Sequence, residues 1–395
     1  MRFLTETIPG TGGILKDVPE DFVVTEIPSY LPCGEGEHVF AEIEKRGVTT
    51  FEAIRRIAGV LKVKERDVGY AGLKDARGVT RQTLSIPRVD PERLLALQLS
   101  GITVLSARRH RNKLKPGHLT GNRFRITIKG TAGDGADNAR RVLDVLTLRG
   151  VPNYFGEQRY GSQGNSHLIG GAILRGDYRG AVDALIGEPA AIRDAGWREA
   201  VEAYRRGDLE TSARLFPGHC RTERDVIRRL LDRPDQYEKA LHAVHPRLKA
   251  LYLSAWQSAL FDLLLDRRLE SFDRVMAGDL AWRHANGACF LVEDVPVEQA
   301  RAERFEISPS GPLFGSRMSK PAGEPLEHEA QVLREQGIEA ALFDGTGERM
   351  EGGRRPLRVP LASPVLDRAG EDLVLEFSLP RGAYATSVLR EIMKT

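Results

Sequence analysis

Hydrophobic and polar positions alternate with two different periods in the first 160 residues, one typical of strands and one typical of helices. Val39, Ala41 and Ile43 share one face of an alternating segment, as in a half-buried strand. Thr49 and Glu52 are spaced as a capping box in front of an apolar stripe of helical period. These patterns predict strands over residues 21–27, 38–44 and 122–129, and helices over residues 49–61, 90–99 and 138–148.

The remainder of the chain has a different character. Residues 177–268 carry apolar side chains at helical spacing and predict a mostly helical region, which a more irregular Gly- and Pro-containing portion follows to about residue 353. The chain then returns to a strand over 373–379 and a helix over 383–394. A strand-rich start, a helical middle and a strand-helix end indicate that one domain is inserted into another.

Composition restricts the class of protein and its compartment. The 395 residues are 41% hydrophobic and 29% charged, which is typical of a globular protein and not of a disordered chain. No apolar run reaches the roughly 18 residues that a membrane span needs, and no secretory signal is visible near residue 1. The three cysteines are far apart and odd in number, which argues against a disulfide framework. We therefore expect a cytoplasmic protein.

The net charge of +3 conceals an uneven distribution. Residues 1–156 hold 25 Lys and Arg against 18 Asp and Glu, a charge of +7, whereas the remainder has a charge of −4. Residues 101–130 contain eight cations and no acid, and Arg123 and Arg125 occupy one face of the strand predicted over 122–129. Such a block is often only a solvated loop. Because this one leads into ordered structure, it also fits the footprint of a nucleic-acid backbone.

The segment 70–82 carries the strongest chemical signal. Asp75 lies between Gly72 and Gly78, with cationic neighbours and apolar strand-like residues outside. Glycines allow a sharp turn or a close approach to a ligand, and nearby cations favour the ionised carboxylate that a nucleophile or general base needs. The alternative is an ordinary solvated turn, which uses the same residue types.

This segment resembles the signature of the TruD family of tRNA pseudouridine synthases. The matching positions are Ala71, Gly72, Lys74, Asp75, Thr80 and Gln82, and Gly78 stands where the family usually has alanine. Further stretches resemble the same family in the same order, namely residues 12–16 with 19–24, 121–124, 152–161 and 379–391. Together they cover both ends of the chain, which makes the resemblance specific.

The resemblance implies an α+β fold. We expect a pseudouridine synthase core with a mixed sheet and flanking helices, built from residues 1–156 and 352–395 and interrupted by the family's largely helical insertion domain at residues 157–351. It also implies an isomerase that breaks the C1′–N1 bond of a specific uridine, at position 13 of tRNA, and rejoins the base through C5. Asp75 would be the catalytic residue, although the sequence leaves open whether its carboxylate adds covalently, stabilises a cationic sugar or removes a sugar proton.

The resemblance places five further residues at the substrate RNA site, and each has a simpler alternative. Phe22, Phe124 and Phe377 would hold the unstacked uridine, yet spacing alone favours core packing for each. Asn122 would read the uracil edge or merely begin a strand after a glycine. Lys16 would contact a phosphate or balance Asp75, or lie on the surface.

Other features of the sequence argue against a metal site or a cofactor and leave two alternative functions open. His242 and His245 have no acidic or cysteine partner nearby, so we expect no metal site. Residues 10–13 lack the ending of a phosphate-binding loop, and the isomerisation needs no cofactor. We expect tRNA as the partner, no membrane association and a monomer. Two alternatives remain: a non-catalytic RNA-binding protein on the same fold, and a hydrolytic RNA N-glycosidase. Gln158 and Arg159 lie at the expected domain junction and would line a cleft or pack a hinge.

Overall fold

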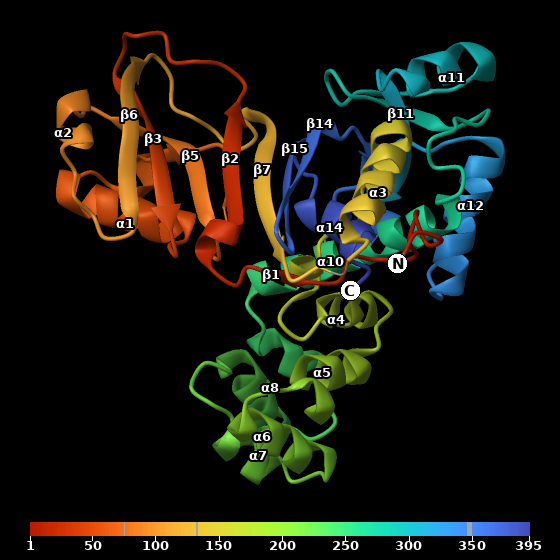
Figure 1. Ribbon diagram of the computed structural model, residues 1–395. Helices are drawn as coiled ribbons and strands as arrows, with labels where there is room; N and C mark the ends of the chain where they lie inside the picture. Colours follow the sequence, from red (N-terminus) through yellow and green to blue (C-terminus); the bar gives the residue numbers. More distant parts are fainter. Residues whose placement is uncertain (75, 132, 346–349) are drawn as a thin grey trace. The chain divides into compact units, whose positions relative to one another are not determined.

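The computed structural model describes residues 1–74, 76–131, 133–345 and 350–395 (Figure 1). The chain divides into two compact units. The first comprises Phe3–Val151 and Val359–Thr395, and we call it the sheet unit. The second comprises Met1–Arg2 and Pro152–Arg358, and we call it the helical unit.

A mixed sheet forms the centre of the sheet unit. Among the described residues, seven of its nine strands follow the order β14-β15-β7-β2-β5-β3-β6, while β1 pairs with β7 and β4 with β5. β2 and β5 are parallel, and the other pairs are antiparallel. The strands are β1 (Ile14–Leu15), β2 (Phe22–Pro28), β3 (His38–Arg46), β4 (Gly69–Tyr70), β5 (Val79–Pro87), β6 (Ile102–His110), β7 (Leu119–Lys129), β14 (Ala362–Ala369) and β15 (Asp372–Pro380).

Helices form two separate apolar clusters with this sheet. One cluster joins α1 to buried residues of β3 and β5, and the other joins α3 and α14 to buried residues of β2, β7 and β15 (Figure 1). Such packing follows from alternation, because the apolar side chains of each strand lie on one face. The α-helices are α1 (Thr50–Leu61), α2 (Pro91–Leu95), α3 (Gly135–Arg149) and α14 (Ala385–Met393). The predicted α+β class is confirmed.

Most of the predicted elements of this unit are present, with informative differences. Thr49 caps α1 by accepting a hydrogen bond from the Glu52 backbone N–H at 3.1 Å, but the Glu52 carboxylate binds Arg56 instead of completing the capping box. The helix predicted over 90–99 ends at Leu95 as α2, because the chain turns back at Gly101 and reaches β6. β6 itself was not predicted.

The helical unit begins and ends at two short strands, β8 (Val151–Pro152) and β13 (Arg358–Val359). Its helices are α4 (Ser166–Leu174), α5 (Tyr178–Ile186), α6 (Ala195–Arg205), α7 (Leu209–Leu215), α8 (Arg221–Asp232), α9 (Tyr237–Ala240), α10 (Pro246–Arg268), α11 (Val295–Glu303), α12 (Gly323–Glu335) and α13 (Leu342–Gly345). The strands β9 (Leu280–Arg283), β10 (Cys289–Leu291), β11 (Ile307–Leu313) and β12 (Gly353–Pro356) form a small sheet in the order β10-β9-β11-β12. The predicted helical character of residues 177–268 is therefore present, and the portion described as irregular contains this sheet.

Buried polar contacts hold the start of the helical unit against α10. The Asp262 carboxylate accepts hydrogen bonds from the Phe155 backbone N–H at 3.0 Å and from the Tyr160 hydroxyl at 2.5 Å. Burial raises the pKa of Asp262 to about 7. Arg159 donates to the Ser258 hydroxyl at 3.0 Å. Arg159 therefore contributes to packing within this unit.

Candidate active site

The segment that leads to Asp75 is fixed by hydrogen bonds to three elements of the sheet unit. Asp75 itself lies outside the described residues. The Lys74 backbone N–H donates to Thr50 Oγ1 at 3.0 Å, and the Lys74 carbonyl accepts from Lys45 Nζ at 3.2 Å. Gln82 Nε2 donates to the Gly72 carbonyl at 3.4 Å. α1, β3 and β5 together therefore set the position of the backbone immediately before the predicted catalytic residue.

A buried ion pair ties the same segment to β2. Lys74 Nζ lies 2.9 Å from Glu26 Oε2, and the two side chains are 7% and 2% exposed. Glu26 Oε1 also accepts a hydrogen bond from the Thr83 backbone N–H at 3.2 Å. Glu26 was not singled out in the sequence, although its alternation with Phe22 and Val24 places it on their buried face, where a carboxylate requires a partner.

A glycine brings β2 close to the far end of the segment. Gly78 has φ of 145°, a conformation that side-chain-bearing residues rarely adopt, and a Cβ there would lie 2.5 Å from the Phe22 carbonyl oxygen. Glycine at the position where the family usually has alanine thus accommodates this contact.

Three aromatic side chains form a row across β2, β7 and β15. The Phe22 and Phe124 ring centroids are 6.4 Å apart, and those of Phe124 and Phe377 are 5.4 Å apart. Phe377 pairs directly with Phe124 in the β15–β7 ladder. All three are nearly buried, at 7%, 6% and 1% exposure, and belong to the apolar cluster under α3 and α14. They therefore have the packing role that spacing favoured, and their contact with substrate stays a prediction.

The two polar residues predicted at the substrate site border this row. Lys16 Nζ lies 4.1 Å from the centre of the Phe22 ring, a cation–π contact. Asn122 occupies β7, where it pairs with Glu26 of β2 and Leu379 of β15. Asn122 Oδ1 is buried and has no hydrogen-bond partner among the described residues. A buried acceptor without a donor is costly, and a bound ligand with an N–H group would satisfy it.

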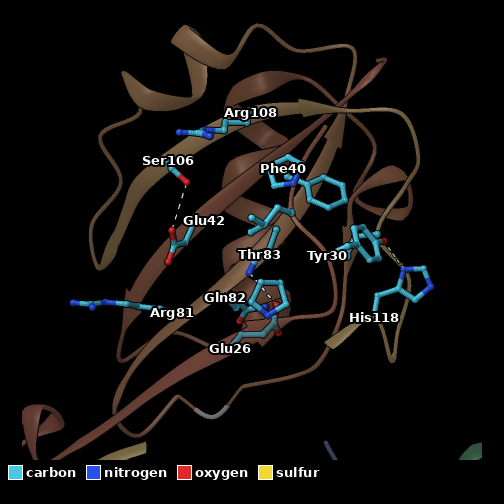
Figure 2. Close-up of a pocket in the computed structure, with 14 residues that line it drawn as sticks. Glu26, Tyr30, Phe40, Glu42, Arg81, Gln82, Thr83, Ser106, Arg108 and His118 are labelled. Carbon is cyan, nitrogen blue, oxygen red and sulfur yellow. Dashed lines mark hydrogen bonds between the residues drawn. The ribbon is translucent and has the colours of Figure 1, made fainter. Parts of the chain in front are cut away.

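A cavity of about 440 Å³ is lined by Glu26, the partner of Lys74 in the buried ion pair. Figure 2 shows the side chains around this cavity. Glu26 and Gln82 line it at one end. Its other walls come from β3, β5 and β6, from the chain between β2 and β3, and from the chain between β6 and β7. The lining residues are Glu26, Pro28, Tyr30, Leu31, Pro32, Phe40, Glu42, Arg81, Gln82, Thr83, Ser106, Arg108, Leu114 and His118.

Acids from distant parts of the sequence neutralise much of the basic block. Arg123 and Arg125 both contact Glu376 of β15, at 2.7 and 3.4 Å, and Lys129 lies 3.1 Å from Asp17. Arg111 pairs with Glu35.

Within the described ranges, the side chains of Arg108 and Lys115 have neither an ion pair nor a hydrogen bond. Arg108 and Lys115 therefore remain available to a phosphate, whereas the cationic face predicted for β7 is partly paired.

The described residues offer neither a metal site nor a membrane span. No cluster of three or more His, Cys, Asp and Glu side chains in the described part of the chain is arranged to hold a metal ion. No described helix has both the length and the apolarity to cross a bilayer. Cys33, Cys220 and Cys289 are all free thiols.

Comparison with known proteins identifies the class to which this fold and site belong. The family model for tRNA pseudouridine synthase D (TruD) matches residues 1–392. The chain is 64% identical over 394 residues to tRNA pseudouridine synthase D of Geobacter sulfurreducens, covering 100% of this chain and 97% of that protein. It is 38% identical to the protein of the same name from Thermus thermophilus, covering 99% of this chain and 92% of that one.

A solved structure shows the same fold. The crystal structure of a candidate tRNA pseudouridine synthase D from Methanosarcina mazei superposes with a TM-score of 0.86 at 28% identity, covering 100% of this chain and 96% of that one. The chain belongs to the TruD family of tRNA pseudouridine synthases, which are isomerases.

Proposed function

We propose that this chain converts the uridine at position 13 of tRNA to pseudouridine, without a cofactor, as a cytoplasmic monomer. The observation that carries the proposal is the family match over residues 1–392, a range that includes Asp75, the predicted catalytic residue. The anchored backbone before that residue supports it, because a catalytic group must be held in a fixed place to act in the transition state.

The proposed reaction leaves the composition of the RNA unchanged, although one hydrogen is exchanged with solvent. The C1′–N1 bond breaks, the uracil turns within the site, and C5 bonds to C1′. The hydrogen at C5 leaves as a proton while N1 gains one. The Asp75 carboxylate would either add to C1′, stabilise positive charge on the sugar or remove a sugar proton.

The residues around the aromatic row support binding of an extruded uracil. Asn122 Oδ1 lacks a donor among the described residues, and the N3–H of uracil is a donor that would satisfy it. Phe22 and Phe124 would give the base an aromatic surface in place of its former neighbours. Lys16, on the Phe22 ring, would lie near a phosphate. Phe377 supports Phe124 from the next strand.

The division of the chain into two units supports separate roles for the core and the insertion. We propose that residues 1–156 and 352–395 form the catalytic core and that residues 157–351 are the family's insertion domain. The packing of Arg159 and Asp262 within the helical unit supports a structural role for the start of that insertion. Residues 157–351 hold 26 Lys and Arg against 32 Asp and Glu, a charge of −6, which supports the core as the main source of attraction to the RNA backbone.

The experiment that tests the function uses tRNA transcripts labelled with tritium at uridine C5. Formation of the new bond must expel that hydrogen, so the purified chain should release label from one uridine per tRNA and leave the strand intact. Sequencing of the product after pseudouridine-specific modification should place it at position 13. Loss of the base instead of isomerisation would indicate an N-glycosidase, and binding without release of label would indicate a non-catalytic RNA-binding protein.

Replacing an unpaired cation should weaken RNA binding in a salt-dependent manner. We expect Lys115→Gln to lower tRNA affinity and to reduce the slope of log Kd against log salt by about 0.9, because one phosphate contact releases roughly one counterion. Arg111→Gln is the matched control, since Arg111 already pairs with Glu35 and should change the slope less. Filter binding from low to physiological salt measures both. Equal slopes for Lys115→Gln and the unaltered chain would place the RNA on another surface.

A further inference from the structure

The cavity beside the Glu26–Lys74 pair has the chemistry of a nucleotide-binding pocket that differs from a uracil site (Figure 2). Its volume of about 440 Å³ lies in the range of pockets that enclose small ligands. Figure 2 shows Glu42, Ser106 and Arg108 on one side of the cavity and Tyr30 and His118 on the other. A carboxylate, a guanidinium and an aromatic wall thus surround one space.

The aromatic wall is held in place before any ligand arrives. The Tyr30 ring stacks on His110 with centroids 5.3 Å apart and planes inclined by 25°. The Tyr30 hydroxyl lies 2.7 Å from His118 Nδ1, and the Phe40 ring is 6.2 Å away. Tyr30 is nevertheless 36% exposed. A rigid, partly exposed ring of this kind is a surface on which a nucleobase stacks.

The Glu42 carboxylate on the polar wall of the cavity can accept two hydrogen bonds side by side. Over the described residues, the one side-chain hydrogen bond to Glu42 comes from Ser106 Oγ at 3.5 Å, the outer limit for such a bond. An ionised carboxylate accepts about four hydrogen bonds and donates none, so most of the acceptor capacity of Glu42 is unused. Arg108, on the neighbouring strand, has no partner in the described part of the chain and can reach a phosphate.

These features distinguish among the bases. Guanine presents two adjacent donors, N1–H and the N2 amino group, on its Watson–Crick edge, and a carboxylate can accept from both. Uracil presents one N–H between two carbonyl oxygens, which a carboxylate repels. Adenine and cytosine each place a ring acceptor beside the amino donor. The edge that complements Glu42 is therefore that of guanine.

We propose that this cavity binds a guanine nucleotide of the substrate RNA, extruded next to the target uridine, with its base on Tyr30, its Watson–Crick edge on Glu42 and its phosphate on Arg108. The inference rests on the proposed RNA substrate. Proximity supports it, because Glu26 and Gln82 belong to the cavity wall and also hold Lys74 and Gly72, which precede Asp75. A nucleotide in the cavity and one at Asp75 would thus fix the register of the strand.

The first test compares the kinetics of two variants that remove the same charge. We expect Glu42→Gln to raise the KM for tRNA about tenfold and to leave kcat within twofold, because the contact binds substrate and transition state alike. Glu371→Gln removes an exposed carboxylate from the turn between β14 and β15 and should leave both constants within twofold. Both substitutions are isosteric, and thermal melting checks folding. Equal KM values for the two variants would overturn the proposal that the cavity binds guanine.

The second test does not depend on catalysis. Transcripts containing 6-thioguanosine keep the N1 and N2 donors and form cross-links under near-ultraviolet light. We expect mass spectrometry to place the cross-link in the peptide of Tyr30–Pro32 or of Leu114–His118. Cross-linking there by 4-thiouridine transcripts alone would overturn the base assignment. A cross-link at Tyr30 from a chain that releases no tritium would retain the pocket and refute the proposed isomerase.

A third experiment distinguishes an RNA ligand from a free nucleotide of the same chemistry. Free GMP should bind weakly and compete with tRNA only at millimolar concentration, since most affinity for RNA resides in the backbone. Micromolar GMP binding that Glu42→Gln abolishes, with tRNA binding unchanged, would instead identify a free guanine nucleotide as the ligand and overturn the RNA assignment.

Discussion

Asp75→Asn is expected to abolish release of tritium from labelled tRNA while leaving tRNA affinity within a few-fold. Asparagine has nearly the same shape as aspartate, but it cannot carry the charge that a nucleophile, a base or a stabiliser of a cationic sugar needs. Loss of such a group lowers turnover by a factor on the order of 10⁴ or more. Affinity should persist because phosphate contacts supply most of it. Single-turnover release of label and filter binding measure the two effects separately.

A second aspartate provides the control for this expectation. Asp67 lies a few residues earlier, at the end of a short helical turn (Glu65–Asp67). Asp67→Asn should leave both turnover and affinity within twofold. If Asp75→Asn lost affinity in proportion to activity, Asp75 would serve binding and not the reaction. If it kept its turnover, the assignment of the catalytic residue would be wrong.

The elements that could be predicted from the sequence are those with one buried and one exposed face. β7 is the clearest example, since Phe124, Ile126 and Ile128 are buried and alternate with exposed Arg123 and Arg125. β6 escaped prediction because it is an edge strand, and most of its residues are at least partly exposed, so it lacks a regular apolar period. Alternation reveals a strand only where one face is covered.

The candidate site could be predicted in part, because the family resemblance named its residues but not their contacts. Phe22, Phe124 and Phe377 come together through the order β2-β7-β15, which joins segments more than 200 residues apart. The sequence also could not show that Glu376 neutralises Arg123 and Arg125, because that pairing depends on the register of β15 against β7. Long-range pairing of strands is invisible to local periodicity.

The Glu26–Lys74 pair is the feature of the site with the largest expected effect on stability. Lys74→Met should reduce the free energy of unfolding of the sheet unit by about 3–5 kcal/mol, because it leaves a carboxylate that is 2% exposed without its counterion. The matched control is Arg46→Met, which breaks an exposed pair with Glu20 and should cost less than about 1 kcal/mol. Similar losses in the free energy of unfolding for the two variants would show that the buried pair stabilises the unit no more than the exposed pair does.

The measurement must report on the sheet unit. The three tryptophans, Trp197, Trp256 and Trp282, all lie in the helical unit, so their fluorescence would follow the wrong part of the chain. Hydrogen exchange of the amides of β2 and β5 reports on the unit that contains the pair.

A double variant separates stability from function. In Lys74→Met with Glu26→Gln, the glutamine is neutral and its carbonyl oxygen can still accept from the Thr83 backbone N–H, so no charge is left buried and most of the lost stability should return. Turnover should remain low, because the Lys74 side chain no longer ties the segment before Asp75 to β2 and the predicted catalytic group is less well held. Full recovery of turnover together with stability would mean that the pair serves folding alone. Recovery of stability without turnover would mean that Glu26 and Lys74 position the catalytic segment.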